Sequence, residues 1–409
     1  MVILREEKQY QKLFLAGVVN GIGDRFSSVA VLAMLLQLTG SGFAVGMTLA
    51  IRLIPFVFFG PLGGWLADRV SRKVILVATD FIRIIFALSF LMVNSKADLW
   101  IVYLSSFILA AGEAIYSPAR KSSIPLLISK DKLMKVNSME QVLIGIVLIG
   151  GAFSGGIVSF IFGPSITFWV NAASFLGAAA IISTIRFPDN VRVNESSQPK
   201  KKSTPVIFKK VILQSLPVLI LLVCEVLIAF MNGIDNVLIS VYAVSEYHLG
   251  DIGVGLFYGA LGIELTLSYS VANRLRKNFL VTGLVCLMLE GTFLLLLSRT
   301  HLVVFAFLLF CLVAFVSGIG NACFDTVLMK EIPEEHQGMM FGLLATIGNT
   351  ILGLSMFLSG VALDFVAPSL LGLIGGGAYI VIAIVLLAVI SSKAYRKRSQ
   401  SLKNLAFRL

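Results

Sequence analysis

Long apolar stretches, each about the length needed to cross a lipid bilayer, recur along almost the whole chain. A helical span needs about 20 mostly apolar residues to cross a hydrocarbon core of about 30 Å. Twelve such stretches are present, at 12–38, 43–66, 74–95, 98–119, 137–162, 164–186, 214–241, 250–272, 277–298, 301–329, 338–366 and 368–392. No strand-like alternation competes with them, so each backbone is expected to satisfy its hydrogen bonds as a helix. The sequence predicts an all-α membrane protein with twelve transmembrane helices.

The composition excludes an ordinary soluble globular protein. Hydrophobic residues make up 57% of the chain, charged residues only 13%, and the mean hydropathy is +0.94. A soluble core cannot bury that much apolar surface over 409 residues, whereas a bilayer accepts it as solvent. The polar, basic segment 1–12 precedes an apolar run too long for the hydrophobic region of a cleavable signal peptide. We therefore expect the first span to act as its own insertion signal.

The net charge of +11 would suit a nucleic-acid partner, but the positions of the basic residues indicate another role. Nearly all lysines and arginines outside the spans fall in segments that alternate onto one side of the predicted membrane. The loops on the opposite side hold only Lys96 and Arg299. Positively charged loops stay on the cytoplasmic side. The charge therefore predicts that both termini are cytoplasmic, and no nucleic acid is needed to explain it.

One substantial polar stretch divides the chain into two blocks of six spans. Segment 187–212 is rich in lysine, serine and proline, which is typical of a flexible linker. It separates a predicted N-terminal bundle at 1–186 from a C-terminal bundle at 213–392, and a basic cytoplasmic tail follows at 393–409. Two similar bundles around a central site are a common way of building a transporter.

The segment between the second and third spans carries the most specific motif. It reads Gly64-Trp-Leu-Ala-Asp68-Arg69-Val-Ser-Arg72-Lys73-Val-Ile-Leu76, and a degraded copy, Ala272-Asn273-Arg274-Leu275, follows the eighth span. The motif resembles the signature loop of the major facilitator superfamily, with Ser71 in place of the usual second glycine. With twelve spans and the central linker, the resemblance covers essentially the whole chain. It implies the major facilitator fold, two pseudo-symmetric six-helix bundles that carry a small-molecule substrate across the lipid bilayer.

Several shorter motifs resemble one bacterial exporter branch of that superfamily, which holds macrolide-efflux and enterobactin-exporter proteins. They are Gly23-Asp24, Leu38-Thr39-Gly40-Ser41, Arg52-Leu-Ile-Pro55, Asp80-Phe-Ile-Arg83, Ser117-Pro118-Ala119 and Tyr258-Gly259-Ala260-Leu261-Gly262. The resemblance implies export of amphiphilic small molecules, of drug or siderophore type. We expect the protein to be a monomer in the bacterial cytoplasmic (inner) membrane. The resemblance further implies proton antiport with rocker-switch alternating access, with the proton gradient as energy source and no cofactor. The alternative is an importer or a lipid-moving transporter of the same superfamily.

Charged side chains inside the predicted spans mark candidate functional residues, because each costs roughly 2.5–3.5 kcal/mol to insert. Asp24 lies near the middle of the first span, with Asn20 one turn earlier on the same face. Arg52 enters from the outer end of the second span to a similar depth. A permanent pair of Asp24 and Arg52 would be structural, whereas a pair that substrate disrupts would couple protons to transport. Both interpretations stay open.

Polar residues in three further spans are candidates for binding substrate or protons. In the seventh span, Glu225 and Asn232 share a helix face at a spacing of seven residues. Glu113 and Tyr116 lie in the fourth span, and Asn321 lies in the tenth. The resemblance implies that the first, fourth, seventh and tenth spans line a central cavity. The alternative is that these side chains only hydrogen-bond neighbouring helices.

A last group of charged residues is expected to form a gate at the cytoplasmic face. The expected gate residues are Asp68, Arg69, Arg72, Asp80, Arg83 and Asp325. A loop that only sets topology would not explain an aspartate among its basic residues, so we expect Asp68 to close one conformation of the transporter. Asp80 and Arg83 are spaced to pair within one helix. A structural role is favoured for this pair, and the alternative is that the two residues extend the cluster.

The sequence lacks the residue patterns of an enzyme or a metal protein. Its cysteines all fall within predicted spans, and no Cys/His spacing typical of a metal site occurs. No Walker-type phosphate-binding loop occurs, so ATP is not the expected energy source. A receptor would normally carry a sizeable soluble domain, whereas the longest predicted loop here is the linker. We therefore expect a transporter rather than an enzyme or a receptor.

Overall fold

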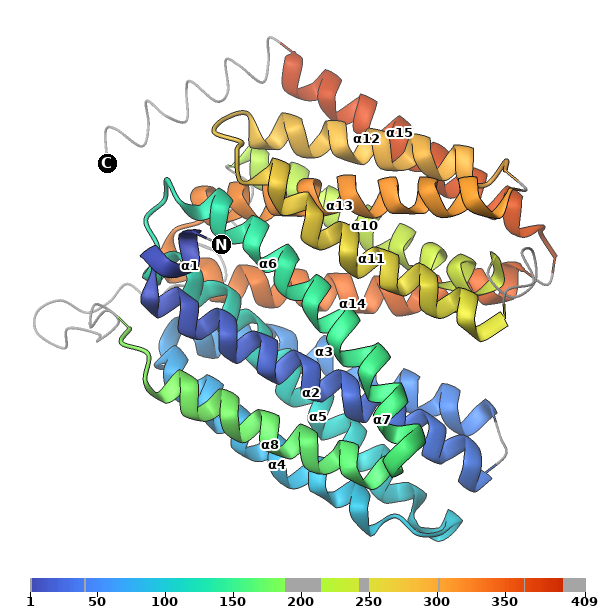
Figure 1. Ribbon diagram of the computed structural model, residues 1–409. Helices are drawn as coiled ribbons and strands as arrows, with labels where there is room; N and C mark the ends of the chain where they lie inside the picture. Colours follow the sequence, from blue (N-terminus) through green and yellow to red (C-terminus); the bar gives the residue numbers. More distant parts are fainter. Residues whose placement is uncertain are drawn as a thin grey trace, which may run out of the picture.

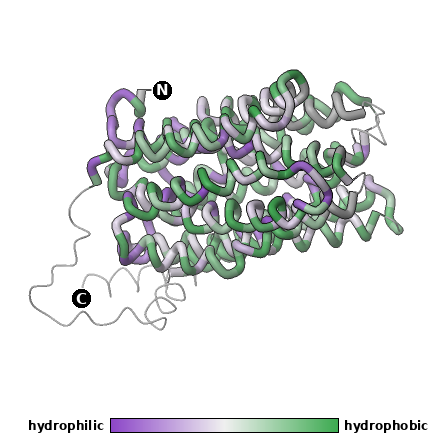
Figure 2. The backbone as a smooth tube through the Cα atoms, turned by 90° about the horizontal axis from the view of Figure 1, so that it is seen from below, coloured by the Kyte–Doolittle hydropathy of each residue, from purple (hydrophilic) through white to green (hydrophobic). Residues whose placement is uncertain are grey.

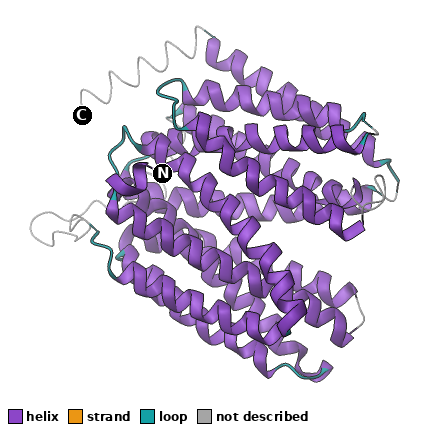
Figure 3. Cartoon of the chain, viewed as in Figure 1, coloured by secondary structure: helices purple, strands orange, loops and turns teal. Residues whose placement is uncertain are grey.

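The chain is described here by a computed structural model that covers residues 2–39, 42–187, 215–242, 250–300, 302–363 and 365–392. Within these ranges the chain is helical and contains no strand (Figure 3). The helices of the first half are α1 (Val2–Glu6), α2 (Lys8–Thr39), α3 (Gly42–Arg69), α4 (Arg72–Ser89), α5 (Leu99–Leu127), α6 (Leu133–Val147), α7 (Ser154–Phe162) and α8 (Pro164–Ser183). Those of the second half are α10 (Leu216–Val241), α11 (Gly250–Ala272), α12 (Phe279–Leu297), α13 (Val303–Glu331), α14 (Gln337–Ala362) and α15 (Pro368–Ser391).

The helices have the length and the surface of membrane spans. In the described part of the chain, ten helical segments are long and apolar enough to cross a membrane. α2 and α11 occupy the two remaining predicted stretches. Large apolar side chains point outward, among them Phe58 and Phe357, which are 67% and 68% exposed. Such exposure suits a helix that faces lipid, because lipid tails solvate apolar groups. The prediction of an all-α membrane protein is confirmed.

Two predicted spans differ from the helices in the structure. The fourth span was expected to end at residue 119, but α5 continues to Leu127 and therefore carries Arg120 and Lys121 on a helix rather than in a loop. The fifth span was expected as one helix over 137–162. It consists of α6, a π-helical stretch at Leu148–Phe153, and α7. The charged pair Arg120 and Lys121 explains why the sequence suggested an earlier end.

The helices pack in the same way within each half. In the first half α4 lies against both α5 and α8, and α3 lies against α5. In the second half α12 lies correspondingly against α13 and α15, and α11 against α13 (Figure 1). The halves meet where α3 packs on α14 and where α6 packs on α11. This is the repeated six-helix arrangement that the sequence predicts.

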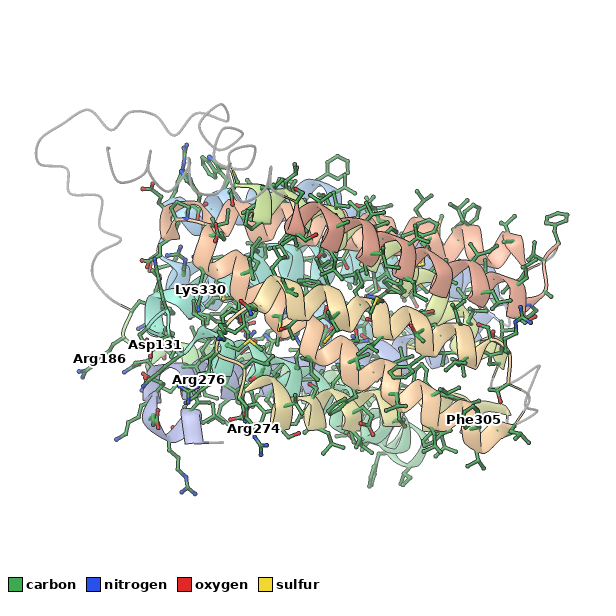
Figure 4. The ribbon with its side chains drawn as sticks, turned by 90° about the horizontal axis from the view of Figure 1, so that it is seen from above. Asp131, Arg186, Arg274, Arg276, Phe305 and Lys330 are labelled. Carbon is green, nitrogen blue, oxygen red and sulfur yellow. The ribbon has the colours of Figure 1, made fainter. Side chains whose placement is uncertain are left out.

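The two ends of the helix bundle differ in charge. We call one the Asp68 end, where α3 ends at Arg69 and α14 begins at Gln337, and the other the Leu302 end, where α12 ends and α13 begins. The labelled charged residues of Figure 4, Asp131, Arg186, Arg274, Arg276 and Lys330, all lie toward the Asp68 end, whereas Phe305 lies at the opposite end. The most hydrophilic part of the tube in Figure 2 likewise lies near the N-terminus. Residues 188–214 of the linker region and the tail 393–409 lie outside the described residues.

The two halves approach each other closely because glycines lie at both crossings. A Cβ atom on Gly64 of α3 would lie 2.5 Å from the carbonyl oxygen of Gly338, and one on Gly342 would lie 2.5 Å from that of Gly60. At the other crossing, a Cβ on Gly145 of α6 would collide with the carbonyl oxygen of Gly262 in α11. Small residues allow such backbone contact between membrane helices.

Candidate functional site

A buried arginine in α4 joins polar side chains from three helices of the first half. Arg83 is fully buried, and its guanidinium lies 3.3 Å from Oδ1 of Asp24 in α2 and 3.2 Å from Oε2 of Glu113 in α5. It also donates a hydrogen bond of 3.3 Å to Oδ1 of Asn20. With Asp80, these residues are called the Arg83 centre. Sequence reasoning paired Arg83 with Asp80 alone, because spacing within one helix reveals no partner on another.

Asp80 supports this centre from the same helix as Arg83. Its Oδ1 accepts a hydrogen bond of 2.8 Å from Nδ2 of Asn20 and lies 4.0 Å from Nη1 of Arg83. The ring of Phe175 in α8 lies against the guanidinium, at 4.2 Å, and the ring of Tyr116 lies at 5.9 Å. Aromatic faces stabilise a desolvated guanidinium. Arg83 is thus held on nearly every side by the first half of the chain.

The centre is buried at the arginine and reachable at two of its carboxylates. The side chains of Asp24 and Glu113 are 24% and 39% exposed, whereas those of Arg83 and Asp80 are 1% and 0% exposed. Arg52 of α3 reaches Asp24 from the other side, at 3.6 Å, and is itself 28% exposed. A proton or a ligand can therefore reach Asp24 and Glu113 without entering the packed core. The expected pair of Asp24 and Arg52 is present, and Asp24 is shared with Arg83.

The signature segment connects the two halves at the Asp68 end. Asp68 accepts hydrogen bonds of 2.8 Å from the backbone N–H groups of Gly338 and Met339, at the start of α14. A helix N-terminus attracts a carboxylate because its first N–H groups are unpaired and carry partial positive charge. Arg72 lies 3.8 Å from Asp68 and donates to the backbone oxygen of Glu334, at 3.4 Å.

The remaining expected gate residues divide among different places. Arg69 stacks on the Trp65 ring, at 4.4 Å, and makes no ion pair among the described residues. Asp80 and Arg83 belong to the Arg83 centre, about two and three helical turns along α4 from Arg72. The structure therefore does not bring them to Asp68, and the predicted extension of that cluster was wrong.

Lys121 and Asp325 form a second bridge between the halves. Nζ of Lys121 in α5 lies 3.5 Å from Oδ2 of Asp325 in α13, and Glu225 of α10 interacts electrostatically with both. Sequence reasoning took Lys121 for a loop charge, because it ended the fourth span too early. The apolar run Ile124-Pro125-Leu126-Leu127, which continues the helix, was the signal that could have placed it.

Three other candidates have no ion pair or side-chain bridge in the described part of the chain. Asn232 accepts a bond from Asn236 through its backbone oxygen only, and Asn321 lies half-buried one turn before Asp325. Tyr116 is buried, and its hydroxyl has no hydrogen-bond partner among the described residues.

Further pairs that the sequence did not reveal stabilise the first half. Arg120 lies 2.6 Å from Glu140 of α6, which also accepts a hydrogen bond of 2.8 Å from Tyr10. Outside the spans, a hydrogen bond of 2.7 Å to Glu7 raises the pKa of Lys132. Among the described residues, no group of three or more His, Cys, Asp or Glu side chains is placed to hold a metal ion.

Comparisons with known proteins agree with this architecture. The family model of the Major Facilitator Superfamily matches residues 13–354. The uncharacterized MFS-type transporter YfiS of Bacillus subtilis is 23% identical over 94% of each chain, and macrolide efflux protein A of Streptococcus pyogenes is 22% identical over 92% of this chain and 95% of that protein. A solved bacterial homologue of the iron transporter ferroportin, in an outward-facing state, has a TM-score of 0.73 at 17% identity, covering 93% of this chain and 99% of that one. This last likeness concerns the fold.

Proposed function

The chain belongs to the Major Facilitator Superfamily, and from that premise we propose that it exports amphiphilic small molecules by proton antiport. Membership makes it a multi-pass membrane transporter rather than an enzyme. Export is supported by the similarity to a protein named for macrolide efflux over nearly the full length of both chains. The proposed substrates are of drug or siderophore type, and the energy source is the proton gradient, without a cofactor.

The observation that carries the coupling proposal is the balance of charge at the Arg83 centre. Direct ion pairs join two arginines, Arg83 and Arg52, to three carboxylates, Asp24, Asp80 and Glu113. Arg83 is shared by all three carboxylates, and Arg25 adds an electrostatic interaction with Asp24 and Glu113 without forming an ion pair with either. A low-dielectric interior does not tolerate an uncompensated charge, so a carboxylate that the shared arginine leaves uncompensated takes up a proton. Asp24 and Glu113 are the exposed members, and proton exchange occurs there. Substrate binding competes for the same groups and releases the proton, which is the exchange that antiport requires.

The contacts between the halves suit a rocker-switch movement. Asp68 holds the N-terminus of α14, and Lys121 holds Asp325, both toward the Asp68 end. Asn137 of α6 donates a hydrogen bond of 3.0 Å to Thr326 of α13 in the same region. All three contacts break when the bundles rock open at this end and form again when they close. The proposed rocking units are 1–186 and 213–392, connected by the linker 187–212.

The charge asymmetry supports the placement of the protein. We place it as a monomer in the bacterial cytoplasmic membrane, with the Asp68 end and both termini in the cytoplasm, because basic segments remain on that side. The basic residues labelled in Figure 4 lie toward this end. In that orientation, the described contacts close the cytoplasmic side.

The test compares drug accumulation in a pump-deficient host that expresses the wild type, Asp24→Asn or Arg299→Gln, the last being an exposed control. We expect the wild type and Arg299→Gln to lower accumulation, and Asp24→Asn to export poorly and without dependence on the proton gradient. Full-rate, proton-independent export by Asp24→Asn would end the coupling proposal for this residue. Energised inverted and right-side-out vesicles then give the direction, and substrate accumulation only in right-side-out vesicles would replace export by import.

A further inference from the structure

A third arginine lies near the Arg83 centre and is exposed. Arg25 is placed near the middle of α2, directly after Asp24. Arg52 and Arg83 pair directly with Asp24, whereas Arg25 makes no ion pair or hydrogen bond with any residue that the structure describes. Neighbouring residues of a helix do not face each other, which explains why Arg25 does not pair with Asp24. A charge retained at the middle of a span is by default a candidate for a functional site.

The packing of α2 shows which of its sides are covered. Ser27 accepts a hydrogen bond of 2.6 Å from Asn171 of α8, so that side of α2 is closed by α8. Phe26 is buried against α7, where a Cβ atom on Gly155 would lie 2.9 Å from the Cα of Phe26. The residues directly after Arg25 therefore belong to the packed interior of the first half.

The uncovered side of α2 carries both signs of charge. Successive residues of a helix lie about 100° apart, so Ser28 lies between Asp24 and Arg25 around the helix axis. Asp24 is 24% exposed, Ser28 is half-buried and Arg25 is exposed. These three residues are called the Arg25 strip. Arg52 borders the strip beside Asp24, because it donates a hydrogen bond of 2.9 Å to the hydroxyl of Ser28.

A π-helical stretch of the chain supports Arg25 on its other side. A Cβ atom on Gly151, within Leu148–Phe153, would lie 2.6 Å from the Cβ of Arg25, so only a glycine lets the two backbones approach this closely. The same stretch packs on α11 of the second half. Arg25 thus lies beside a contact between the halves. Short π-helical insertions in α-helices are frequent at functional sites.

The arrangement of charges suits a ligand that itself carries two charges. The partly exposed carboxylates Asp24 and Glu113 can face a cationic group. A guanidinium binds a carboxylate through two parallel hydrogen bonds, and Arg25 has its donors free among the described residues. One free guanidinium balances a single negative charge, which favours a carboxylate over a phosphate group of nearly two charges.

We propose that Arg25 binds the carboxylate of a zwitterionic amphiphile whose cationic group faces Asp24 and Glu113. Arg25 is then a residue that determines which substrates are accepted. The proposal rests on the proposed function, and it narrows the transported molecules to amphiphiles that carry both an ammonium and a carboxylate group.

The experiment measures binding to the full chain in lipid nanodiscs, without any ion gradient. The first probe is Nε-dansyl-lysine, an amphiphile with a free ammonium and a free carboxylate. The second is its methyl ester, which keeps the ammonium and loses the negative charge. Fluorescence titration gives the affinity of each probe for the wild type, Arg25→Gln, Arg25→Lys and the control Arg299→Gln, at an exposed arginine outside the strip.

We expect the wild type and Arg299→Gln to bind the acid more tightly than the ester. Arg25→Gln should weaken binding of the acid about tenfold, the usual effect of losing a hydrogen bond between charged groups. It should bind the ester at least as tightly as the wild type does, because loss of a cation beside Asp24 favours the ammonium group. Arg25→Lys should be intermediate for the acid, since lysine keeps the charge without the paired donors.

A parallel loss of acid and ester binding in Arg25→Gln would show a structural role and overturn the proposal. A wild type that binds the ester as tightly as the acid, or neither probe, would overturn it as well, even if Arg25→Gln did not fold. Because no proton gradient is present, the result is separate from the coupling test. Proton-independent export by Asp24→Asn would leave the preference for the acid intact.

Discussion

At the scale of single residues, Arg83 is the cation that pairs with the buried carboxylates of the first half. A buried guanidinium is retained only when its partners offset the loss of water. Here the partners come from α2, α4 and α5, so the arginine also holds these helices together. Glu113 and Asp24 are partly exposed. The Arg83 centre therefore holds the helices together and also presents two carboxylates to solutes.

Replacing Arg83 by Gln should abolish transport and lower stability. The change leaves Asp24, Asp80 and Glu113 without their shared cation, and breaking a buried pair from one side typically costs about 3–5 kcal/mol. Transport in vesicles and thermal melting of the purified protein measure the two effects. Arg299→Gln, at an exposed arginine, is the control and should change neither. Wild-type melting and transport in Arg83→Gln would contradict the assignment of Arg83 as the centre of this network.

At the scale of elements, the crossings between the halves depend on backbone contact. At the α6–α11 crossing, a Cβ on Gly262 would lie 2.6 Å from Cγ1 of Ile149 and 3.0 Å from the carbonyl oxygen of Gly145. Since a backbone atom cannot turn aside as a side chain does, a larger residue must separate the helices. The close approach of the two halves at this crossing therefore relies on residues that have no chemistry of their own.

Gly262→Val should slow transport strongly while leaving insertion into the membrane intact. Overpacking of this kind typically costs about 1–3 kcal/mol, here in the closed arrangement of α6 and α11. Gly259→Val is a matched control, because it lies in the same helix with nothing within 4 Å of its Cβ position. Both variants carry the same side chain, so helix propensity cancels between them. Equal transport by the two would show that the crossing need not close as tightly as the structure indicates.

At the scale of the whole molecule, polar bridges join the two halves. The bridge between Lys121 and Asp325 crosses from one half to the other, and its two side chains are 44% and 22% exposed. Partly exposed pairs contribute about 0.2–1 kcal/mol. That is small for folding, but it is sufficient to shift a conformational equilibrium.

Lys121→Asp should open the Asp68 end, and adding Asp325→Lys should restore closure. An energy of about 1 kcal/mol corresponds to about a fivefold change in the ratio of closed to open molecules. Spin labels on cysteines at Lys130 and Glu334, in a variant without the native cysteines, report the distance between the halves by pulsed electron paramagnetic resonance. If the charge swap left the distance distribution as broad as the single variant does, the ion pair would not control this end.

Much of the fold could be predicted, because membrane spans follow from local composition. Twelve apolar stretches, the two-block organisation and the position of the Asp68 motif are all readable along the chain. The end of one helix could not be predicted, because the polar pair Arg120 and Lys121 resembled the start of a loop, although α5 continues beyond them. Sequence alone cannot show that Glu140 of another helix offsets the cost of Arg120 on a helix.

The sequence predicts which residues belong to the site, but it does not predict which of them contact one another. Asn20, Asp24, Glu113 and Arg83 all stand out in the sequence as polar groups within apolar runs. That they form one centre depends on how α2, α4 and α5 pack, and helix rotation is a collective property of the bundle. The free-energy cost of inserting each residue into the membrane therefore follows from the sequence. The partner of each buried charge is decided only by tertiary packing.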